Sequence, residues 1–346
     1  MRYYSIQITN PNDGSLISAP GFAGLLGNQT YGSFVNGRTI PAAWNVELDI
    51  PVIDAATSQG FATATVWGIS VAEIGQANNL VGKNIAIYGG MQKGLPLANP
   101  AQSGLLVSGW IYQCFGNWIG TDMTLDFVIA PGQATSTNSG GFGTLASPKN
   151  ITLNWPKNTP LSTALKNCLQ TAFPGYTVNI SISANLVRPN DEIGPFPTLE
   201  QLAQYCLETS LSIIKTSGYL GVSIVPQGKT INVFDYSTAP ANTVQLAFQD
   251  LIGQPTWLEG ASISIKTVMR ADLKVGSAIT LPPALITTTA ASPSSLVNLK
   301  AAFAGGFGVQ SLRHVGNFRQ PSADAWVSVI EGAPYPAALL PGPLVQ

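Results

Sequence analysis

Side chains that could carry out catalysis are scarce in this sequence. His314 is the single histidine, so a Ser/His/Asp or Cys/His site would have to be built on it. It lies within residues 311–316, where we predict a strand, and we interpret it as a structural or interface histidine. The sequence contains no Gly-x-Ser-x-Gly turn of the kind that exposes a nucleophilic serine. We therefore assign no catalytic residue.

Metal and cofactor motifs are equally weak. One histidine cannot make a multi-histidine metal site, and no carboxylates have the spacing of a calcium loop. Asp191 and Glu192 form the only adjacent acidic pair, which we interpret as a solvated turn. A glycosidase pair could come from distant carboxylates, but nothing in the sequence marks one. Residues 141–146 match the dinucleotide fingerprint, yet a Ser/Thr/Asn-rich segment precedes them and Pro148 follows, where a strand and a helix are needed. We assign no cofactor and no metal.

The three cysteines are Cys114, Cys168 and Cys206. An odd number at long spacings indicates neither a disulfide framework nor a zinc ribbon. Cys168 and Cys206 fall on the apolar faces of predicted helices. We interpret both as buried thiols that act as small hydrophobic side chains.

The charge content points to an assembly subunit. Only 10% of the 346 residues are charged, against about 25% in a typical soluble protein. The net charge of −1 excludes a nucleic-acid reader that binds through phosphates, since such a protein needs a basic excess.

No stretch reaches the ~20 apolar residues of a membrane helix, and the first residues lack a signal-peptide core. We expect a soluble chain made in the cytoplasm, with much of its surface covered by partners. The alternative is a monomer kept soluble by Ser, Thr, Asn and Gln.

Alternating apolar residues predict a first β block. Residues 44–52 show the pattern most clearly, because Val46, Leu48 and Ile50 alternate with polar neighbours. Further strands are predicted over 61–69, 83–88, 105–114 and 123–129. Strands at this spacing indicate an antiparallel sandwich or barrel.

Helical spacing replaces the strand pattern after residue 150. A first helix is predicted from Leu161 to Phe173, with Thr159 as its N-cap and Pro160 in the first helical position. A second begins with the capping-box pattern Thr198-x-x-Gln201. Strands are predicted over 176–182, 220–225 and 230–236, and a second β block follows with strands over 244–248, 263–269, 278–281, 307–315 and 326–330.

The chain is thus predicted to be mainly β with a small α/β insert. Its divisions are a first β domain over 1–132, a Gly/Ser/Thr-rich linker over 133–150, a small α/β domain over 151–240, a second β domain over 241–333 and an extended Pro-rich tail over 334–346. Pro334, Pro336, Pro341 and Pro343 argue against a helix or a central strand in that tail.

Three groups of motifs resemble the baseplate hub proteins of contractile-tailed phages, which are related to the tail protein D group and to the N-terminal half of VgrG spikes. The first group comprises ATATVWGIS at 62–70, LVGKNIAIYGG at 80–90 and LVSGWI at 106–111. The second comprises LIGQP at 251–255 and RADLKVGSAITLP at 270–282. The third comprises RHVGNFR at 313–319 and WVS at 326–328.

The resemblance covers residues 40–332 and implies two tube-type antiparallel β-barrels per chain. It also implies a structural hub in the virion, in which a homotrimeric ring adapts a sixfold tail tube to a threefold central spike and lines the DNA channel. The implied partners are the tail tube protein, the spike, other baseplate proteins and DNA that passes without sequence-specific binding. The Gly-rich stretch 20–37 and the Pro-rich tail have no counterpart in the family pattern, and we interpret them as candidate interfaces of this protein alone.

Two other classes stay open at this point. A tail tube or tube-terminating ring protein would need only one barrel per chain. A particle-associated hydrolase would need a further domain, for which 346 residues leave no room.

Overall fold

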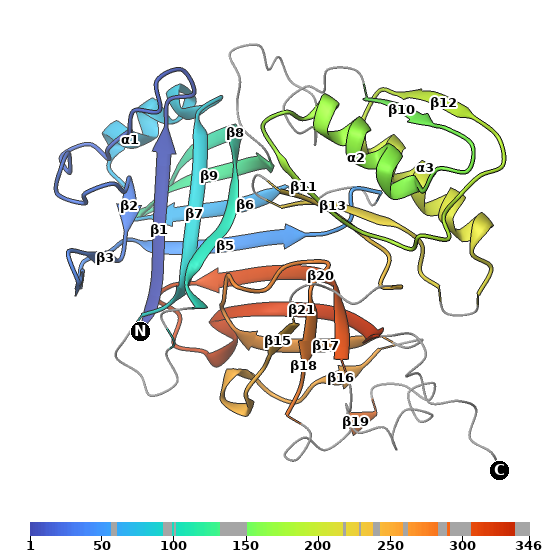
Figure 1. Cartoon of the computed structure of the whole chain (residues 1–346). Helices are drawn as coiled ribbons and strands as arrows, with labels where there is room; N and C mark the ends of the chain where they lie inside the picture. The colour runs from blue at the N-terminus through green and yellow to red at the C-terminus, as the bar shows by residue number, and fades with distance from the viewer. Residues whose placement is uncertain are drawn as a thin grey trace.

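A computed structural model describes residues 1–56, 61–92, 99, 102–131, 151–216, 219–227, 230–237, 243–258, 262–282, 289–290 and 306–335. The described chain is mainly β, with a first β block, an α/β unit and a second β block (Figure 1). The predicted linker 133–150 and the glycine motif at 141–146 lie outside the described residues, as does the tail beyond Tyr335. No helix among the described residues is long and apolar enough to cross a membrane.

The first block contains seven strands of one sheet, a small hairpin and a short helix. Its elements are β1 (Arg2–Thr9), β2 (Tyr31–Gly32), β3 (Phe34–Val35), β4 (Arg38–Thr39), β5 (Asn45–Val52), β6 (Ala62–Trp67), α1 (Val71–Gln76), the 3-10 turn η1 (Ala77–Leu80), β7 (Asn84–Met91), β8 (Gly104–Ile119) and β9 (Asp122–Pro131). All strand pairs in it are antiparallel, in the order β5-β6-β9-β8-β7-β1-β2.

The sheet of the first block folds over on itself. In Figure 1, β1 and β7 run steeply across the direction of β5 and β6. The long strand β8 belongs to both layers, because it pairs with β7 near its start and with β9 from Gly109 onward. Register shifts at Ile87/Tyr88 and Ile111/Gln113 allow the bend. Tyr4 of β1 links the two layers, since its hydroxyl donates to the carbonyl of Trp44, the residue before β5, over 2.8 Å.

The second block is smaller and more irregular. Its strands are β15 (Thr243–Gln245), β16 (Thr256–Trp257), β17 (Ile263–Val268), β18 (Ala278–Thr280), β19 (Thr289–Ala290), β20 (Gly306–Asn317) and β21 (Trp326–Tyr335), with 3-10 turns η3 (Phe248–Asp250) and η5 (Ala323–Ala325). β20 pairs with β21, β18 and β5, so it is the central strand of the block.

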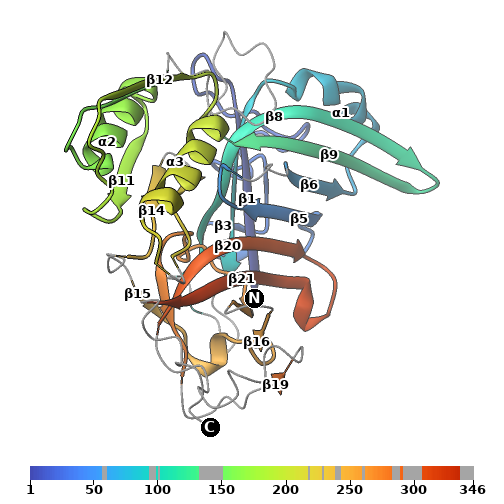
Figure 2. The same ribbon diagram turned by 90° about the vertical axis from the view of Figure 1, so that its right-hand side faces the viewer.

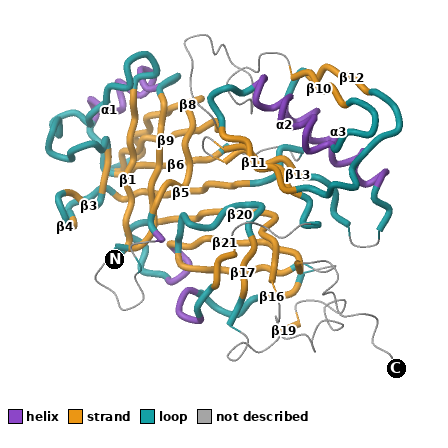
Figure 3. The backbone as a smooth tube through the Cα atoms, in the orientation of Figure 1, coloured by secondary structure: helices purple, strands orange, loops and turns teal. Residues whose placement is uncertain are grey.

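The α/β unit combines two helices with a three-stranded sheet, β11-β14-β13, and a separate two-stranded sheet, β10-β12. Its elements are β10 (Ile151–Trp155), α2 (Leu161–Ala172), β11 (Thr177–Ser181), β12 (Glu192–Phe196), α3 (Leu199–Ile213), β13 (Ser223–Gln227) and β14 (Thr230–Phe234). Figure 3 shows α2 and α3 together at one side of the molecule. Cys168 and Cys206 lie on their buried faces, as predicted, and Cys114 is buried in the first block. Burial raises the pKa of the Cys168 thiol to about 11 and that of Cys114 to about 12.

The prediction of a mainly β chain with an α/β insert is confirmed. The two predicted barrels, however, do not close by backbone pairing among the described residues. Instead β5 pairs with β20, so the two blocks share one 14-stranded sheet. Each block still has its own hydrophobic core, one built around Tyr4, Val66 and Phe127 and the other around Ile265 and Phe307.

Three local predictions are wrong by a small margin. The cap of α2 is Pro160 and not Thr159, because the Thr159 carbonyl accepts a 2.7 Å hydrogen bond from the Trp155 indole and stays outside the helix. The strand predicted over 244–248 ends at Gln245, where the side chain of Asp250 accepts from the Ala247 amide and forms a turn.

The third of these predictions concerns the start of the Pro-rich tail. Pro334 lies within β21 rather than in the tail. β17 pairs with β21 only as far as Gly332, so Pro334 occupies an edge where proline is tolerated.

Candidate functional site

The most elaborate polar structure of this protein lies at the seam between the two β blocks. β5 and β20 pair from Val52↔Leu312 to Glu47↔Asn317. Arg313 donates two hydrogen bonds to Asp49, over 2.7 and 2.6 Å, and Asn317 donates to Glu47 over 2.9 Å. Charged and amide side chains therefore bridge the outer face of the seam, in addition to the backbone pairing.

Two arginines fasten the loop that follows β20. The Arg2 guanidinium donates to the carbonyls of Asn317 over 2.9 Å and Ser322 over 2.6 Å, and it also bonds those of Phe318 and Gln320. Arg319 reaches the other way and donates to the carbonyls of Pro41 and Ala43. Residues at the N-terminus of the chain thus hold a loop that lies more than 300 positions away.

A buried cluster around Arg270 ties the second block to the first. Arg270 is 2% exposed and donates to both carboxylate oxygens of Asp272, over 2.7 and 2.6 Å. Its other nitrogen lies 3.1 Å from Asp250, which also accepts from Gln102 of the first block over 3.2 Å. Burial opposes the charge on Arg270, but the two carboxylates outweigh it and raise its pKa. Removal of Arg270 would leave Asp250, 5% exposed, without its cation.

His314 makes a hydrogen bond that could be mistaken for a catalytic pair. Its Nδ1 lies 2.8 Å from Ser328 Oγ, which is the spacing of a nucleophile and its base. Both side chains are buried, however, and Ser328 Oγ is also bonded to the backbone of Arg270. A substrate has no access to this hydroxyl. The pair connects β20 and β21 to the Arg270 segment.

The buried histidine predicts a measurable pH dependence. Burial lowers the pKa of His314 to about 4 from its usual 6.5. The unfolded chain therefore binds a proton at His314 more readily than the folded chain does. The contribution of neutral His314 to the free energy of unfolding is complete above pH 6.5 and is lost as the pH falls toward 4. This loss amounts to about 3 kcal/mol. We expect urea unfolding of His314→Gln to show a shallower fall in stability over this range than the wild type. If the free energy of unfolding fell equally with pH in His314→Gln and in the wild type, a neutral buried His314 would be contradicted.

The β8–β9 hairpin is the most exposed apolar feature. It projects past its neighbouring strands in Figure 2, beyond the last pairing of β9 with β6 at Thr124. Its tip carries Trp118, 64% exposed, and Ile119, 77% exposed. α1 packs directly on the hairpin backbone at Gly116, where a Cβ would lie 2.8 Å from the Cα of Ile74. The hairpin is thus braced at its base and free of intrachain packing at its tip.

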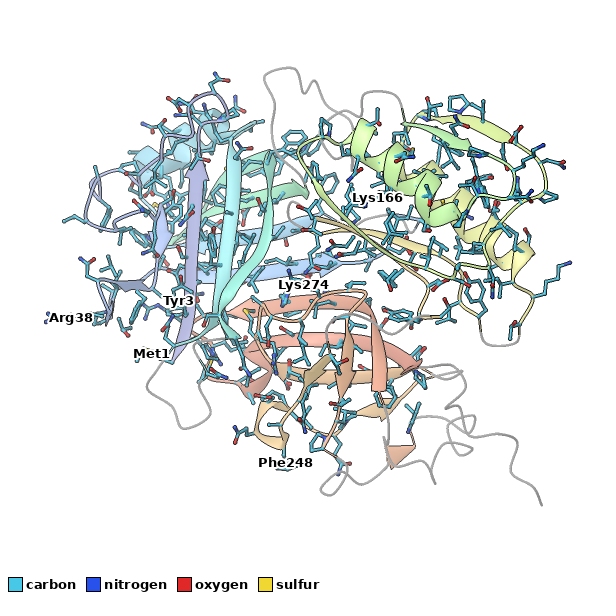
Figure 4. All side chains as sticks on the ribbon, in the orientation of Figure 1. Met1, Tyr3, Arg38, Lys166, Phe248 and Lys274 are labelled. Atoms are coloured by element: carbon cyan, nitrogen blue, oxygen red, sulfur yellow. The ribbon has the colours of Figure 1, made fainter. Side chains whose placement is uncertain are left out.

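Other exposed side chains are scattered around the molecule. Figure 4 shows Met1 near the start of β1 and Phe248 at the lower edge of the second block. Asp191 accepts from the Lys157 amide over 2.7 Å, and Glu192 lies in β12, so this acidic pair supports local structure. Within the described ranges, no three His, Cys, Asp or Glu side chains are grouped to hold a metal ion.

Sequence reasoning missed the Arg270 cluster. The segment Arg270-Ala271-Asp272 was noted only for its family resemblance, although an Arg and an Asp two positions apart can pair on one face of an extended segment. Asp250 and Gln102 come from distant parts of the chain, and no local signal marks them.

Neither the family models nor the curated proteins contain a match to this chain. Among solved structures, the chain is similar to a tail protein from Neisseria meningitidis MC58, with a TM-score of 0.46 and 12% identity over 96% of both chains. The 43 kDa tail protein of prophage MuSo2 from Shewanella oneidensis has a TM-score of 0.47 and 6% identity, over 97% of this chain and 98% of its own. A component of the E. coli type VI secretion system, described as structurally similar to T4 bacteriophage tail proteins gp27 and gp5, has a TM-score of 0.43 and 10% identity, over 86% of this chain and 76% of its own.

By their descriptions, two of these solved structures are tail proteins and the third is a secretion-system component.

Proposed function

We propose that this chain is a structural baseplate hub of a phage tail. Three copies would form a ring that adapts the sixfold tail tube to the threefold central spike and surrounds the DNA channel. The tail tube protein, the spike and other baseplate proteins would be its partners, and the assembled virion its location. DNA would pass without sequence-specific contacts, in keeping with a net charge of −1.

The observation that carries this proposal is the side-by-side fusion of two antiparallel β blocks through β5 and β20. A chain with two such units provides six of them in a ring of three, which is how a threefold part can match a sixfold one. Rigid attachment matters here, because six units must keep fixed spacing around a channel. The backbone pairing, the Arg313–Asp49 bridge and the Arg270 cluster all resist movement between the blocks.

The low charge and the exposed hairpin support the same role. Charged side chains cover little of this molecule, and Trp118 and Ile119 lie in the open at the end of a braced hairpin. Aromatic side chains of this kind are typical centres of protein interfaces. We infer that the β8–β9 tip contacts the neighbouring copy or the adjoining tail ring.

Image reconstruction of assembled particles tests the proposal. We expect three copies in a ring with six β blocks around a channel. The mass of such a ring is about 109 kDa, three times 36.2 kDa. A ring of six chains would reassign the protein to the tail tube, and a monomer absent from every particle would refute the hub role.

A further inference from the structure

The strand β10 of the α/β unit has one unpaired edge. It pairs with β12 from Ile151 to Trp155, and no other described segment pairs with its backbone. Figure 1 shows the two strands at the outer side of the α/β unit. Natural proteins usually protect such an edge with charged side chains, a proline or a bulge. β10 reads Ile-Thr-Leu-Asn-Trp and its register with β12 is unbroken, so it has none of these protections.

The pairing of Thr152 with Pro195 shows which backbone groups of β10 face the unpaired edge. In an antiparallel ladder, pairs that exchange two hydrogen bonds alternate with pairs that exchange none. Proline has no N–H, so Thr152 and Pro195 form a pair of the second kind. Asn154, two positions further on, pairs in the same way with Ile193. The N–H and C=O groups of Thr152 and Asn154 therefore point away from β12.

A groove of about 490 Å³ lies beside these two residues. β10 contributes Thr152 and Asn154 to its lining, and both are exposed to solvent. The opposite wall is a flank of α2, where three small polar side chains follow one another at intervals of four residues: Thr163, Asn167 and Thr171. None of the lining residues is charged. The edge that could accept another strand thus borders an open, uncharged space.

The sequence of β10 is complementary to itself in one antiparallel register. When Leu153 of two copies meets on a twofold axis, Thr152 of each copy lies opposite Asn154 of the other. Both residues direct their backbone groups across the edge, so the two pairs exchange four hydrogen bonds. The Thr152 hydroxyl and the Asn154 amide then lie side by side on the outer face, where cross-strand polar pairs stabilise a sheet. No like charges meet, because β10 carries no charge.

The flank of α2 suits the approach of a second copy. The apolar face of α2 packs in one core with the buried residues of β10, so its polar flank borders the groove and faces the incoming copy. Packed helices lie about 8 to 10 Å apart, the shorter distances requiring small side chains at the contact. Threonine and asparagine meet this requirement. Asn167 is the middle residue of the row, as Leu153 is of β10, and both lie nearest the twofold axis.

We propose that β10 joins two copies of this chain by pairing antiparallel with β10 of the second copy. The two-stranded sheets then form one four-stranded sheet in the order β12-β10-β10-β12. Both copies use the same patch, as in the common twofold dimers. This contact goes beyond the proposed ring of three, because neither β10 nor α2 has a part in the seam or in the β8–β9 hairpin.

Sedimentation equilibrium of the full-length chain tests the pairing. We expect a concentration-dependent dimer of 72.4 kDa, twice 36.2 kDa. Asn154→Pro should raise the dissociation constant about tenfold or more, since it removes two of the four backbone hydrogen bonds from a symmetric pair. Proline is tolerated at this position because the N–H that it removes faces the unpaired edge. The matched control is Ile193→Pro, whose N–H faces the opposite edge of the same two-stranded sheet. Its dissociation constant should equal that of the wild type.

A charge at the middle of the α2 flank provides a second test. Asn167→Lys brings two lysines together near the axis, so it should weaken the dimer at low salt and less so at high salt. A wild type that stays at 36.2 kDa, or equal effects of Asn154→Pro and Ile193→Pro, would overturn the pairing even if rings form in particles. A dimer with the expected pattern but no ring in particles would support the pairing and refute the ring. Folding of each variant is checked by circular dichroism and thermal melting.

Discussion

Replacing Arg270 with methionine is expected to lower the free energy of unfolding by about 3 to 5 kcal/mol. The substitution keeps much of the side-chain volume but leaves Asp250 buried without its cation. It also removes the two hydrogen bonds to Asp272. Because Gln102 of the first block also binds Asp250, contact between the blocks should weaken as well. Urea unfolding monitored by tryptophan fluorescence measures the change.

The matched control for this experiment is Arg313→Met. Arg313 makes a similar two-pronged contact with Asp49, but both side chains are exposed to solvent. Exposed ion pairs contribute between 0 and about 1 kcal/mol, so this variant should remain close to the wild type. A loss of equal size in the two variants would show that the Arg270 cluster does not depend on burial.

Removing the apolar tip of the β8–β9 hairpin is expected to impair assembly while leaving the fold intact. Trp118→Ser together with Ile119→Ser should reduce association with partner subunits more than tenfold, because buried interface tryptophans often contribute 2 kcal/mol or more. The melting temperature should change little, since both side chains lie largely in solvent within one chain. Co-sedimentation with tail particles and thermal melting together measure the two effects.

Ile193→Ser provides the comparison for the hairpin. Ile193 is 69% exposed on β12 of the α/β unit, so the substitution repeats the Ile119→Ser change in another part of the molecule. The Ile193→Ser variant should co-sediment with tail particles as much as the wild type does. Normal incorporation of the double variant at the hairpin tip would remove this hairpin from the set of interfaces.

Local patterns predicted most strands and both helices of the α/β unit. β5 was evident because its buried and outward residues alternate without interruption, and the Thr198 cap of α3 was evident from its spacing to Gln201. β1 was missed, although Tyr4, Ile6 and Ile8 alternate and are fully buried.

The site could not be predicted in the same way, because it is made by long-range pairing. Arg313 and Asp49 are 264 positions apart, and Gln102 and Asp250 are 148 apart. Amphipathic patterns show which residues of β5 and β20 face inward, but they do not say which strand lies next to which. The pairing of β5 with β20, which joins the two blocks in one sheet, could not be predicted for this reason.

The pairing of β5 with β20 also imposes an order of events during synthesis. β5 is complete at Val52, but β20 begins only at Gly306. At about 5 to 20 residues per second, the growing chain carries β5 for roughly 13 to 50 s before its partner exists. Throughout that interval one edge of β5 can pair with another nascent chain.

The charges of β5 favour the correct outcome. Two copies of β5 paired antiparallel would bring Glu47 and Asp49 of one chain against the same carboxylates of the other, and like charges at such positions are unfavourable. β20 brings Asn317 opposite Glu47 and places Arg313 within hydrogen-bonding distance of Asp49. The carboxylates that bind the finished seam therefore also discourage aggregation of the unfinished chain on the ribosome.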